Sequence, residues 1–415
     1  MDDAGSLASV LEVVIAGVAA GGDGLGRLED GRVVFCEGAL PGERVAVELT
    51  DRRRDFARAR LVEVIDPSPW RMAPPCPHVA RGCGGCTWQH VAPGHQPALK
   101  AAIVADALRR IAHLPDAIVL PGAGVPMPGY RTSARLAVDS GGAPCYHRRR
   151  GRDLVEVDSC LVAHPLLEEL IVDGRFPGAG EVVLRVGART GDRLASPDRL
   201  ASRGRGAGRA RVPEGTNIGR RAYIHEEIAG RRWRFSAGSF AQPGPLAAEL
   251  LVAAVSAAAG GEPGPILDLY AGVGVLGGAL AGPSRSLVAV EGGAAGAGDA
   301  AVNLAEVAGA VVITADVADA LGADPVASSH PGVVIADPSR SGLGAAVVEG
   351  IAALGPAVLV LVSCDPASLG LDAGLLARAG YHLEGVDVLD LFPGTFHVEC
   401  VSRLVRAPGG GGAGR

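Results

Sequence analysis

The stretch Ile266-Leu-Asp268-Leu-Tyr270-Ala-Gly272-Val-Gly274-Val-Leu-Gly277 decides the fold of the C-terminal part of this chain. A short apolar run enters a glycine-rich turn and continues into an alanine-rich segment, which is the pattern of a buried strand followed by a helix. Further apolar runs, separated by alanine-rich segments, lie at 286–290, 311–314, 333–336 and 358–362. This alternation predicts an α/β fold with a doubly wound, largely parallel, Rossmann-like sheet in residues 236–407.

The glycine-rich turn predicts a nucleotide-like ligand at the carboxyl edge of that sheet. The second strand ends in Glu291, where a carboxylate can accept hydrogen bonds from both ribose hydroxyls of an adenosine. Asp268, before the first glycine, is expected to face the ligand and to repel a pyrophosphate. S-adenosylmethionine has no phosphate and carries a positive sulfonium, so we expect this cofactor, with NAD as the alternative.

Two reactive side chains follow the later strands. Pro366 ends the fifth strand and leaves Cys364 at the edge where ligands bind, whereas Cys400 is expected in the core. Glu399 interrupts an apolar run near the C-terminus. A thiolate that adds to C6 of uracil makes C5 nucleophilic toward a methyl donor, and a carboxylate can then remove the C5 proton. We predict Cys364 as the nucleophile and Glu399 as the base of such a reaction.

The segment Cys76-Pro-His-Val-Ala-Arg-Gly-Cys83-Gly-Gly-Cys86 brings three thiols together. The chain begins with acidic residues and contains no run of 18 apolar residues, so we expect a cytoplasmic protein without membrane contact. In that compartment clustered thiols favour a metal site over disulfides. Zinc and a [4Fe–4S] cluster both suit thiolate ligands. Candidates for the fourth ligand are Cys145, Cys160, His78 and His90.

Composition and charge divide the 415 residues into parts. The apolar fraction of 48% excludes a largely disordered chain. Although the formal charge is −6, residues 67–235 hold 25 basic and 15 acidic side chains. This β-rich middle region could face a polyanion such as RNA, or its arginines could simply be solvated. Residues 1–66 are typical of a small OB-like β-barrel, and residues 408–415 of a flexible tail.

These motifs resemble those of the RNA 5-methyluridine methyltransferases, in the branch with an N-terminal TRAM domain and a [4Fe–4S] cluster that modifies 23S ribosomal RNA. The resemblance covers nearly the whole chain. Its most specific motifs are the cysteine loop with Trp88-Gln89-His90, Ser239-Phe240-Ala241-Gln242, the Asp268 loop, Asp337-Pro338, Ser363-Cys364-Asp365-Pro366 and His397-Val-Glu399.

The resemblance implies an S-adenosylmethionine-dependent RNA (uracil-C5)-methyltransferase whose barrel, residues 1–66, is an RNA-binding TRAM domain. It implies that the cluster, in the central region 67–235, is held by Cys76, Cys83, Cys86 and Cys160. It also implies that the cofactor is contacted by Gln242, Tyr270, Glu291 and Asp337, with Asp316 as a further candidate. Cys364 and Glu399 keep the roles predicted above.

Two alternative functions stay open at this point. One is a transfer-RNA uridine-C5 methyltransferase, although relatives with that role generally lack both the barrel and the cluster. The other is a non-catalytic RNA-binding protein, which the intact Cys364 and Glu399 oppose. We expect a monomer. Asp365 stands where the family commonly has asparagine, and its charge is expected to raise the pKa of Cys364.

Overall fold

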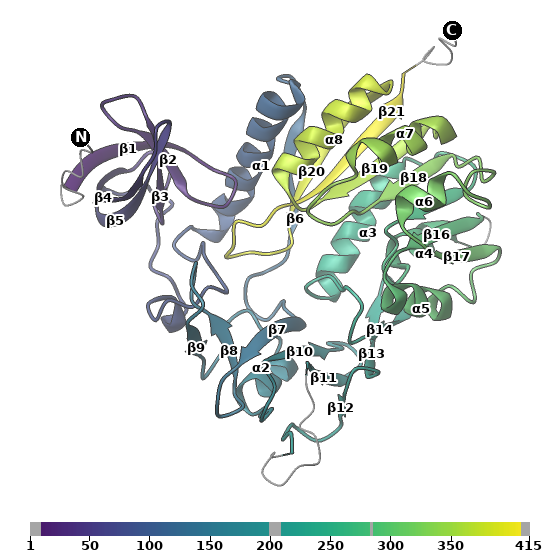
Figure 1. Cartoon of the computed structure of the whole chain (residues 1–415), viewed down its shortest axis with the longest axis horizontal. Helices are drawn as coiled ribbons and strands as arrows, with labels where there is room; N and C mark the ends of the chain where they lie inside the picture. The colour runs from purple at the N-terminus through teal and green to yellow at the C-terminus, as the bar shows by residue number, and fades with distance from the viewer. Residues whose placement is uncertain (1–9, 199–208, 283–284, 408–415) are drawn as a thin grey trace.

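The computed structural model describes residues 10–198, 209–282 and 285–407, which form a barrel, a central β-rich region and a large α/β unit (Figure 1). The segment 408–415, expected to be a flexible tail, lies outside the described residues. Among the helices that are described, none has the length and apolar character needed to cross a bilayer.

The N-terminal strands close into a barrel in the order β1-β2-β3-β5-β4, which confirms the expected barrel. Its strands are β1 (Val10–Val18), β2 (Gly24–Arg27), β3 (Val33–Glu37), β4 (Arg44–Arg52) and β5 (Phe56–Asp66). Alternate valines point inward and are buried, as the period of two requires. The sequence pattern missed β2 because its glycines resemble a turn. A Cβ on Gly26 would lie 2.4 Å from Val13, so this glycine permits close strand packing instead.

A linker with two short 3-10 helices, η1 (Pro77–Val79) and η2 (Pro93–His95), joins the barrel to α1 (Gln96–Ala107). The helix continues as a π-helical turn, η3 (Leu108–Ala112). A small apolar cluster ties the linker to the barrel and to α1. It consists of Leu40, Trp88, Val91, Leu99 and Ile103.

The central region is built on a six-stranded sheet in the order β12-β11-β10-β7-β8-β9 and on a separate hairpin. The sheet strands are β7 (Ser133–Val138), β8 (Pro144–His147), β9 (Leu154–Glu156), β10 (Glu181–Val186), β11 (Arg193–Pro197) and β12 (Thr216–Ile218). The hairpin strands are β13 (Tyr223–Ile228) and β14 (Arg231–Ser236). Helix α2 (Pro165–Val172) packs its leucines on the sheet.

The C-terminal unit contains an eight-stranded sheet in the order β17-β16-β15-β18-β19-β21-β20-β6. The five strands predicted from apolar runs are parallel neighbours: β15 (Ile266–Leu269), β16 (Leu287–Glu291), β17 (Ala310–Thr314), β18 (Val333–Ala336) and β19 (Val358–Ser363). Two strands complete the C-terminal end of the chain, β20 (Tyr381–Asp390) and β21 (Glu399–Arg406). Strand β21 runs antiparallel between β19 and β20.

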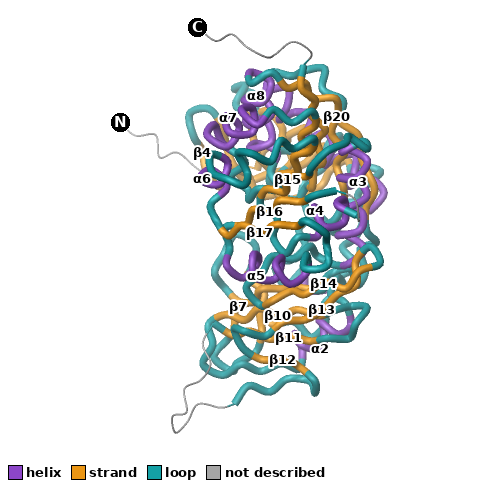
Figure 2. Tube along the Cα trace, turned by 90° about the vertical axis from the view of Figure 1, so that its right-hand side faces the viewer, coloured by secondary structure: helices purple, strands orange, loops and turns teal. Residues whose placement is uncertain are grey.

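Helices cover both faces of this sheet (Figure 2). One face packs against α3 (Pro245–Ala259), α4 (Val275–Ala281) and α5 (Ala294–Asn303). The other packs against α1, α6 (Val317–Leu321), α7 (Gly344–Leu354) and α8 (Pro366–Arg378). Because both faces are buried, the parallel strands are apolar throughout rather than alternating.

The C-terminal sheet also includes a strand from outside residues 236–407. Strand β6 (Val119–Gly124) pairs in parallel with β20, and α1 packs on both strands. The spatial unit is therefore larger than the expected range 236–407, and the range 67–235 is shared between two sheets. Pairing across such a sequence separation leaves no local signal, since β6 is short and rich in glycine and proline.

Candidate active site

The site lies where parallel strands end beside the switch in strand order. Strands β16 and β18 flank β15, so the loops after them diverge and open a crevice at the carboxyl edge. Strand β21 is antiparallel to β19, with Ser363 opposite Cys400, so the first residue of β21 reaches the same edge. A cleft of about 830 Å³ forms there. It is lined by six of the predicted residues, Gln242, Tyr270, Glu291, Asp337, Cys364 and Glu399.

The glycine-rich loop and Glu291 form one end of the cleft. The Glu291 carboxylate accepts hydrogen bonds from the backbone N–H groups of Gly272 at 2.8 Å and Gly293 at 2.6 Å. Each carboxylate oxygen retains further acceptor capacity for a ligand hydroxyl. Tyr270 has a φ of 61°, a left-handed conformation that is strained for a non-glycine residue and occurs mostly at functional loops. This end therefore has the acceptors and the open backbone that an adenosine requires.

Asp268 does not face the cleft, contrary to the sequence prediction. Its carboxylate is buried beneath the loop and accepts a hydrogen bond from the backbone N–H of Gly277 at the start of α4, at 2.8 Å. A Cβ on Gly277 would lie 2.6 Å from this carboxylate, so the helix can approach only because that residue is glycine. Burial and the charges of Asp337 and Glu291 raise the pKa of Asp268 to about 7. Asp268 supports the loop and does not line the cofactor cleft.

Asp316 lies outside the lining of the cleft. Its exposed side chain caps α6 by accepting from the backbone N–H of Ala318 at 2.9 Å. Its charge nevertheless reaches Tyr270, whose pKa is raised by burial and then by Asp316 and Asp372. Asp316 therefore neighbours the cofactor end of the cleft without forming its wall.

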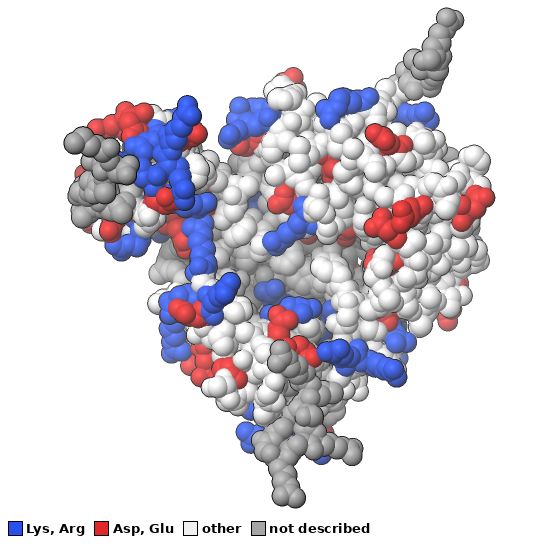
Figure 3. Space-filling model, in the orientation of Figure 1, with Lys and Arg blue, Asp and Glu red and all other residues white. Residues whose placement is uncertain are grey.

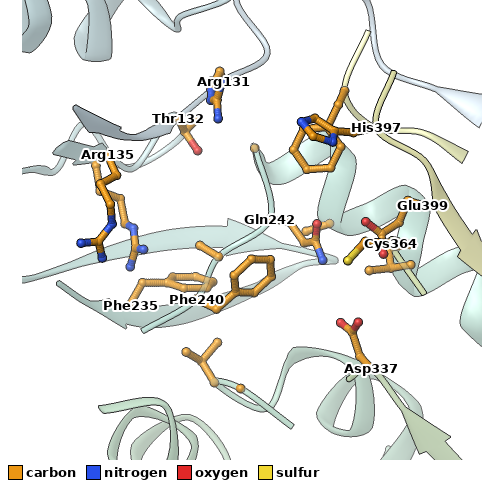
Figure 4. Close-up of a pocket in the computed structure, with 18 of the residues that line it drawn as sticks. Arg131, Thr132, Arg135, Phe235, Phe240, Gln242, Asp337, Cys364, His397 and Glu399 are labelled. Atoms are coloured by element: carbon orange, nitrogen blue, oxygen red, sulfur yellow. The ribbon is translucent and has the colours of Figure 1, made fainter. Parts of the chain in front are cut away.

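Cys364, Asp337 and Glu399 meet at the other end of the cleft (Figure 4). Burial and then the neighbouring Asp337 raise the pKa of Glu399 well above its ordinary value. Burial raises the pKa of Asp337 to about 7. The pKa of Cys364 is also raised, by burial and by these two carboxyls, while Arg340 lowers it. Burial therefore favours the protonated forms of these carboxyls, and a bound cation would favour their ionised forms.

Asp365 has a different role from the one expected. Its side chain is the N-cap of α8 and accepts from the backbone N–H groups of Ala367 and Ser368, both at 2.9 Å. The carboxyls that raise the pKa of Cys364 most are instead Glu399 and Asp337. The cap ends β19 sharply and leaves Cys364 at the rim, where the cleft is open.

The opposite wall contains residues that the sequence did not single out as site residues. Arg131 and Arg135 come from the central sheet, and Phe240, although 67% exposed, lines the cleft beside Gln242 (Figure 4). The Gln242 carbonyl oxygen is buried and has no hydrogen-bond partner within the described residues, so it is free for a ligand. The sequence signal that could have identified Phe240 is its place in the Ser239–Gln242 motif, directly before Ala241 and Gln242.

His397 completes this end of the cleft. It packs against the rings of Phe392 and Phe396. Burial and the positive charges of Arg340, Lys100 and Arg131 lower the pKa of His397 to about 4. The imidazole is therefore neutral at physiological pH and can donate or accept a hydrogen bond.

The four predicted cluster ligands, Cys76, Cys83, Cys86 and Cys160, line one small cavity. Of the other candidates, His78 also lines it but contacts Asp158, while Cys145 and His90 do not line it. Burial, with a smaller contribution from the neighbouring thiols of Cys160 and Cys83, raises the pKa of Cys86 to about 11. Among the described residues, no three His, Cys, Asp or Glu side chains are close enough to form a single-ion site. The four cysteines that line the cavity match in kind and number the thiolate ligands that a [4Fe–4S] cluster takes.

Ion pairs attach the barrel to the central region. Asp23, at 4% exposure, contacts Arg150 at 2.6 Å and Arg149 at 3.6 Å, and Glu37 contacts the same arginines at 3.0 and 2.8 Å. Basic side chains run along this junction beside the hollow in the face of the molecule (Figure 3). The barrel is therefore held against the central region by charged side chains of both.

Comparison with known proteins identifies the family. Residues 7–62 match the model of the TRAM domain. An RNA methyltransferase of uncharacterised specificity from Streptomyces avermitilis is 34% identical, over 96% of this chain and 99% of its own. The chain belongs to the TRAM-domain RNA methyltransferases. The 23S rRNA (uracil(1939)-C(5))-methyltransferase RlmD of Alkalilimnicola ehrlichii is also 34% identical, over 95% of this RNA methyltransferase and 96% of its own length.

A solved structure extends the similarity. The Pyrococcus abyssi tRNA (uracil-54, C5)-methyltransferase in complex with S-adenosyl-L-homocysteine matches with a TM-score of 0.69 and 25% identity, over 95% of this RNA methyltransferase and 100% of that chain. Because the match covers nearly all of both chains, the presence of the barrel does not by itself decide between ribosomal and transfer RNA as the substrate. The expected RNA methyltransferase family and its S-adenosylmethionine cofactor are confirmed.

Proposed function

We propose that this RNA methyltransferase methylates uridine at C5 through a covalent adduct between Cys364 and C6 of the base. The observation that carries the proposal is the pairing of β19 with β21, which brings a nucleophile and a carboxyl from distant parts of the chain to one end of the cofactor cleft. Relatives named as uracil-C5 methyltransferases act on 23S rRNA and on tRNA.

The residues of the cleft divide the reaction between them. The Cys364 thiolate forms a bond to C6, and the C5–C6 electron pair moves to give an enolate that is nucleophilic at C5. S-adenosylmethionine supplies the methyl group when bound. Glu399, once ionised, removes the C5 proton. The C6–sulfur bond then breaks, the C5–C6 double bond returns, and Cys364 leaves as thiolate. Arg340 favours the thiolate, as its lowering of the Cys364 pKa indicates.

The cofactor site fits a sulfonium cation. Glu291 and Asp337 line the cleft between the glycine-rich loop and Cys364. We propose that Glu291 binds the ribose, that Asp337 and Tyr270 contact the remainder of the cofactor, and that Gln242 uses its unpartnered carbonyl oxygen on a bound group. The proximity of Asp337 to a positive charge would offset the cost of its burial.

We also propose that Cys76, Cys83, Cys86 and Cys160 hold a [4Fe–4S] cluster. The support is that all four cysteines line one cavity. The short sequence spacing brings Cys76, Cys83 and Cys86 together, but it does not by itself bring Cys160 to the same cavity. Methyl transfer to an enolate needs no electron. We therefore propose a structural role for the cysteine loop rather than a redox role. The cavity lies next to the cleft, since Gly85 and Tyr146 line both.

For the substrate we propose 23S ribosomal RNA, because the RlmD relatives are more similar in sequence than the tRNA enzyme. The target nucleobase must leave its stack to reach Cys364 in the cleft, which favours an RNA loop over a regular duplex. The exposed Phe240 offers a ring on which a displaced base can stack.

The test uses radiolabelled S-adenosylmethionine with unmodified 23S rRNA and tRNA transcripts, followed by nucleoside analysis. Label recovered as 5-methyluridine from the rRNA transcript is expected. Label in the tRNA alone would replace the proposed substrate while retaining the chemistry. Absence of label from both, with cofactor bound, would favour the non-catalytic RNA-binding alternative.

A further inference from the structure

Lys100 is the single lysine in a chain with 39 lysine and arginine residues, and it is fully buried. It projects from α1 and donates to the Asp390 carboxylate at 2.6 Å and to the carbonyl oxygen of Phe392 at 3.1 Å. Asp390 is 4% exposed and ends β20. Neither Lys100 nor Asp390 lines the cleft, although the charge of Lys100 helps to lower the pKa of His397. Both acceptors of Lys100 lie in the segment that leads to the proposed base.

The position of Glu399 depends on that segment. Glu399 is the first residue of β21, and its backbone pairs with Leu389, the neighbour of Asp390. Within the described residues, no group donates a hydrogen bond to the Glu399 carboxyl, and its raised pKa has burial and Asp337 as its causes. Because the structure gives this carboxyl no hydrogen-bond donor, its position follows from the backbone at the start of β21, which is the strand that residues 390–398 lead into.

Helix α1 holds this segment at a second point. Gln96, one turn before Lys100, is fully buried and accepts from the backbone N–H of Gly394 at 2.7 Å. Its amide donates to the carbonyl oxygen of Val91 at 2.9 Å, which fixes its orientation. Within the segment, Thr395 donates to the carbonyl oxygen of Phe392 at 2.7 Å. The connection from β20 to β21 is therefore anchored from one side by two residues of one helix.

We infer that Lys100 is a positioning residue for the base: its buried ion pair with Asp390 holds residues 390–398 so that the Glu399 carboxyl reaches the C5 proton. The inference rests on the proposed function. A buried ion pair gains little stability over an apolar pair of the same volume, because desolvation offsets the attraction. A role in positioning accounts for keeping the charge there. The compact ammonium also suits two separate acceptors, whereas a planar guanidinium would need more room.

The test separates the steps before and after proton removal. RNA with 5-fluorouridine at the target site can undergo thiol addition and methyl transfer, but its C5 carries no removable proton, so the covalent adduct persists. The rate of adduct formation then reports the early steps, and turnover on ordinary RNA reports proton removal as well. For Lys100→Met we expect adduct formation within about threefold of wild type and turnover lower by at least about tenfold. Covalent Cys364–RNA complex should also accumulate on ordinary RNA.

Arg403→Met is the matched control. It removes an ion pair with Glu384 from the same β20–β21 hairpin, away from residues 390–398, and should leave the ratio of the two rates unchanged. If both rates fall together in Lys100→Met, or if neither falls, Lys100 only stabilises the fold and the inference is wrong. Gln96→Leu, which creates no unpaired charge, should shift the ratio in the same direction and serves if Lys100→Met does not fold. A wild-type chain that forms no adduct would instead overturn the proposed function, and the inference with it.

Discussion

The backbone N–H of Trp88 donates to the carbonyl oxygen of Gly394 at 2.8 Å, so the cysteine loop touches the segment that leads to Glu399. A Cβ on Gly394 would lie 3.1 Å from the sulfur of Met127 and 3.9 Å from the Cβ of Cys86. The cysteine cavity and the end of the cleft that holds Cys364 are therefore packed against each other. A change in the cysteine loop can reach the proposed base through this contact.

Gly394→Ala tests the contact. Gly394 has a φ of 77°, and an added methyl meets Met127, so we expect a loss of about 1–3 kcal/mol in the free energy of unfolding and a lower kcat. Gly380→Ala is the control, because Gly380 has a φ of 90° but open space around the added methyl. Denaturant unfolding and steady-state kinetics of both variants provide the measurement. Equal loss of kcat in the two variants would show that the contact is unimportant.

Cys364→Ala should abolish methyl transfer, because Cys364 is the thiol that lies beside Glu399 and Asp337 in the cleft. Binding of S-adenosylhomocysteine, measured by calorimetry, should stay within about threefold, since Cys364 lies at the other end from Glu291. The control is Cys400→Ala. Cys400 is the second residue of β21 and is fully buried, so this variant should lose stability but keep activity. Turnover by Cys364→Ala would exclude the covalent mechanism.

The stability of the cofactor-free protein should depend on pH through Asp268. Its pKa of about 7 in the folded state exceeds the ordinary value of 3.8, so the folded chain keeps a proton that the unfolded chain has lost. The contribution of Asp268 to the free energy of unfolding is therefore fully present below about pH 4. It is lost as the pH rises to about 7, and it does not change further above that pH. The contribution is on the order of 4 kcal/mol, since one pKa unit corresponds to about 1.4 kcal/mol.

Asp268→Asn keeps an acceptor for the Gly277 N–H and removes the titration. Thermal melting between pH 5 and 8 should show a shallower decline for this variant than for the wild-type chain, with Asp337 and Glu399 responsible for the rest. Identical slopes for the two proteins would contradict the burial of an ionisable Asp268.

Replacement of single cysteines should separate the proposed cluster ligands from other thiols. Cys160→Ser should lower the iron content and the visible absorbance of anaerobically purified protein, because sulfur ligands are needed for the cluster. Cys145→Ser is the control, since Cys145 is buried but lies outside the cysteine cavity. A colourless wild-type protein that contains zinc and is fully active would exclude the iron–sulfur assignment.

The sequence by itself determined the parallel strands of the C-terminal sheet and pointed to the residues of the cleft. Apolar runs of four to six residues between alanine-rich helices marked β15 to β19 almost to the residue, because strands buried on both faces must be apolar throughout. Cys364 and Glu291 could be placed at strand ends for the same reason. The spacing of Cys76, Cys83 and Cys86 pointed to a shared site, since residues so close in sequence cannot lie far apart.

Only the tertiary structure decided which distant residues meet. Strand β6 joins the C-terminal sheet, Asp268 turns beneath the glycine loop instead of facing the cleft, and Asp365 caps α8. The ion pair between Lys100 and Asp390 joins residues 290 positions apart. Periodicity reports whether a side chain faces a core, but not which other segment shares that core. That choice is made by packing and by the pairing of buried charges, which exist only once the chain is folded.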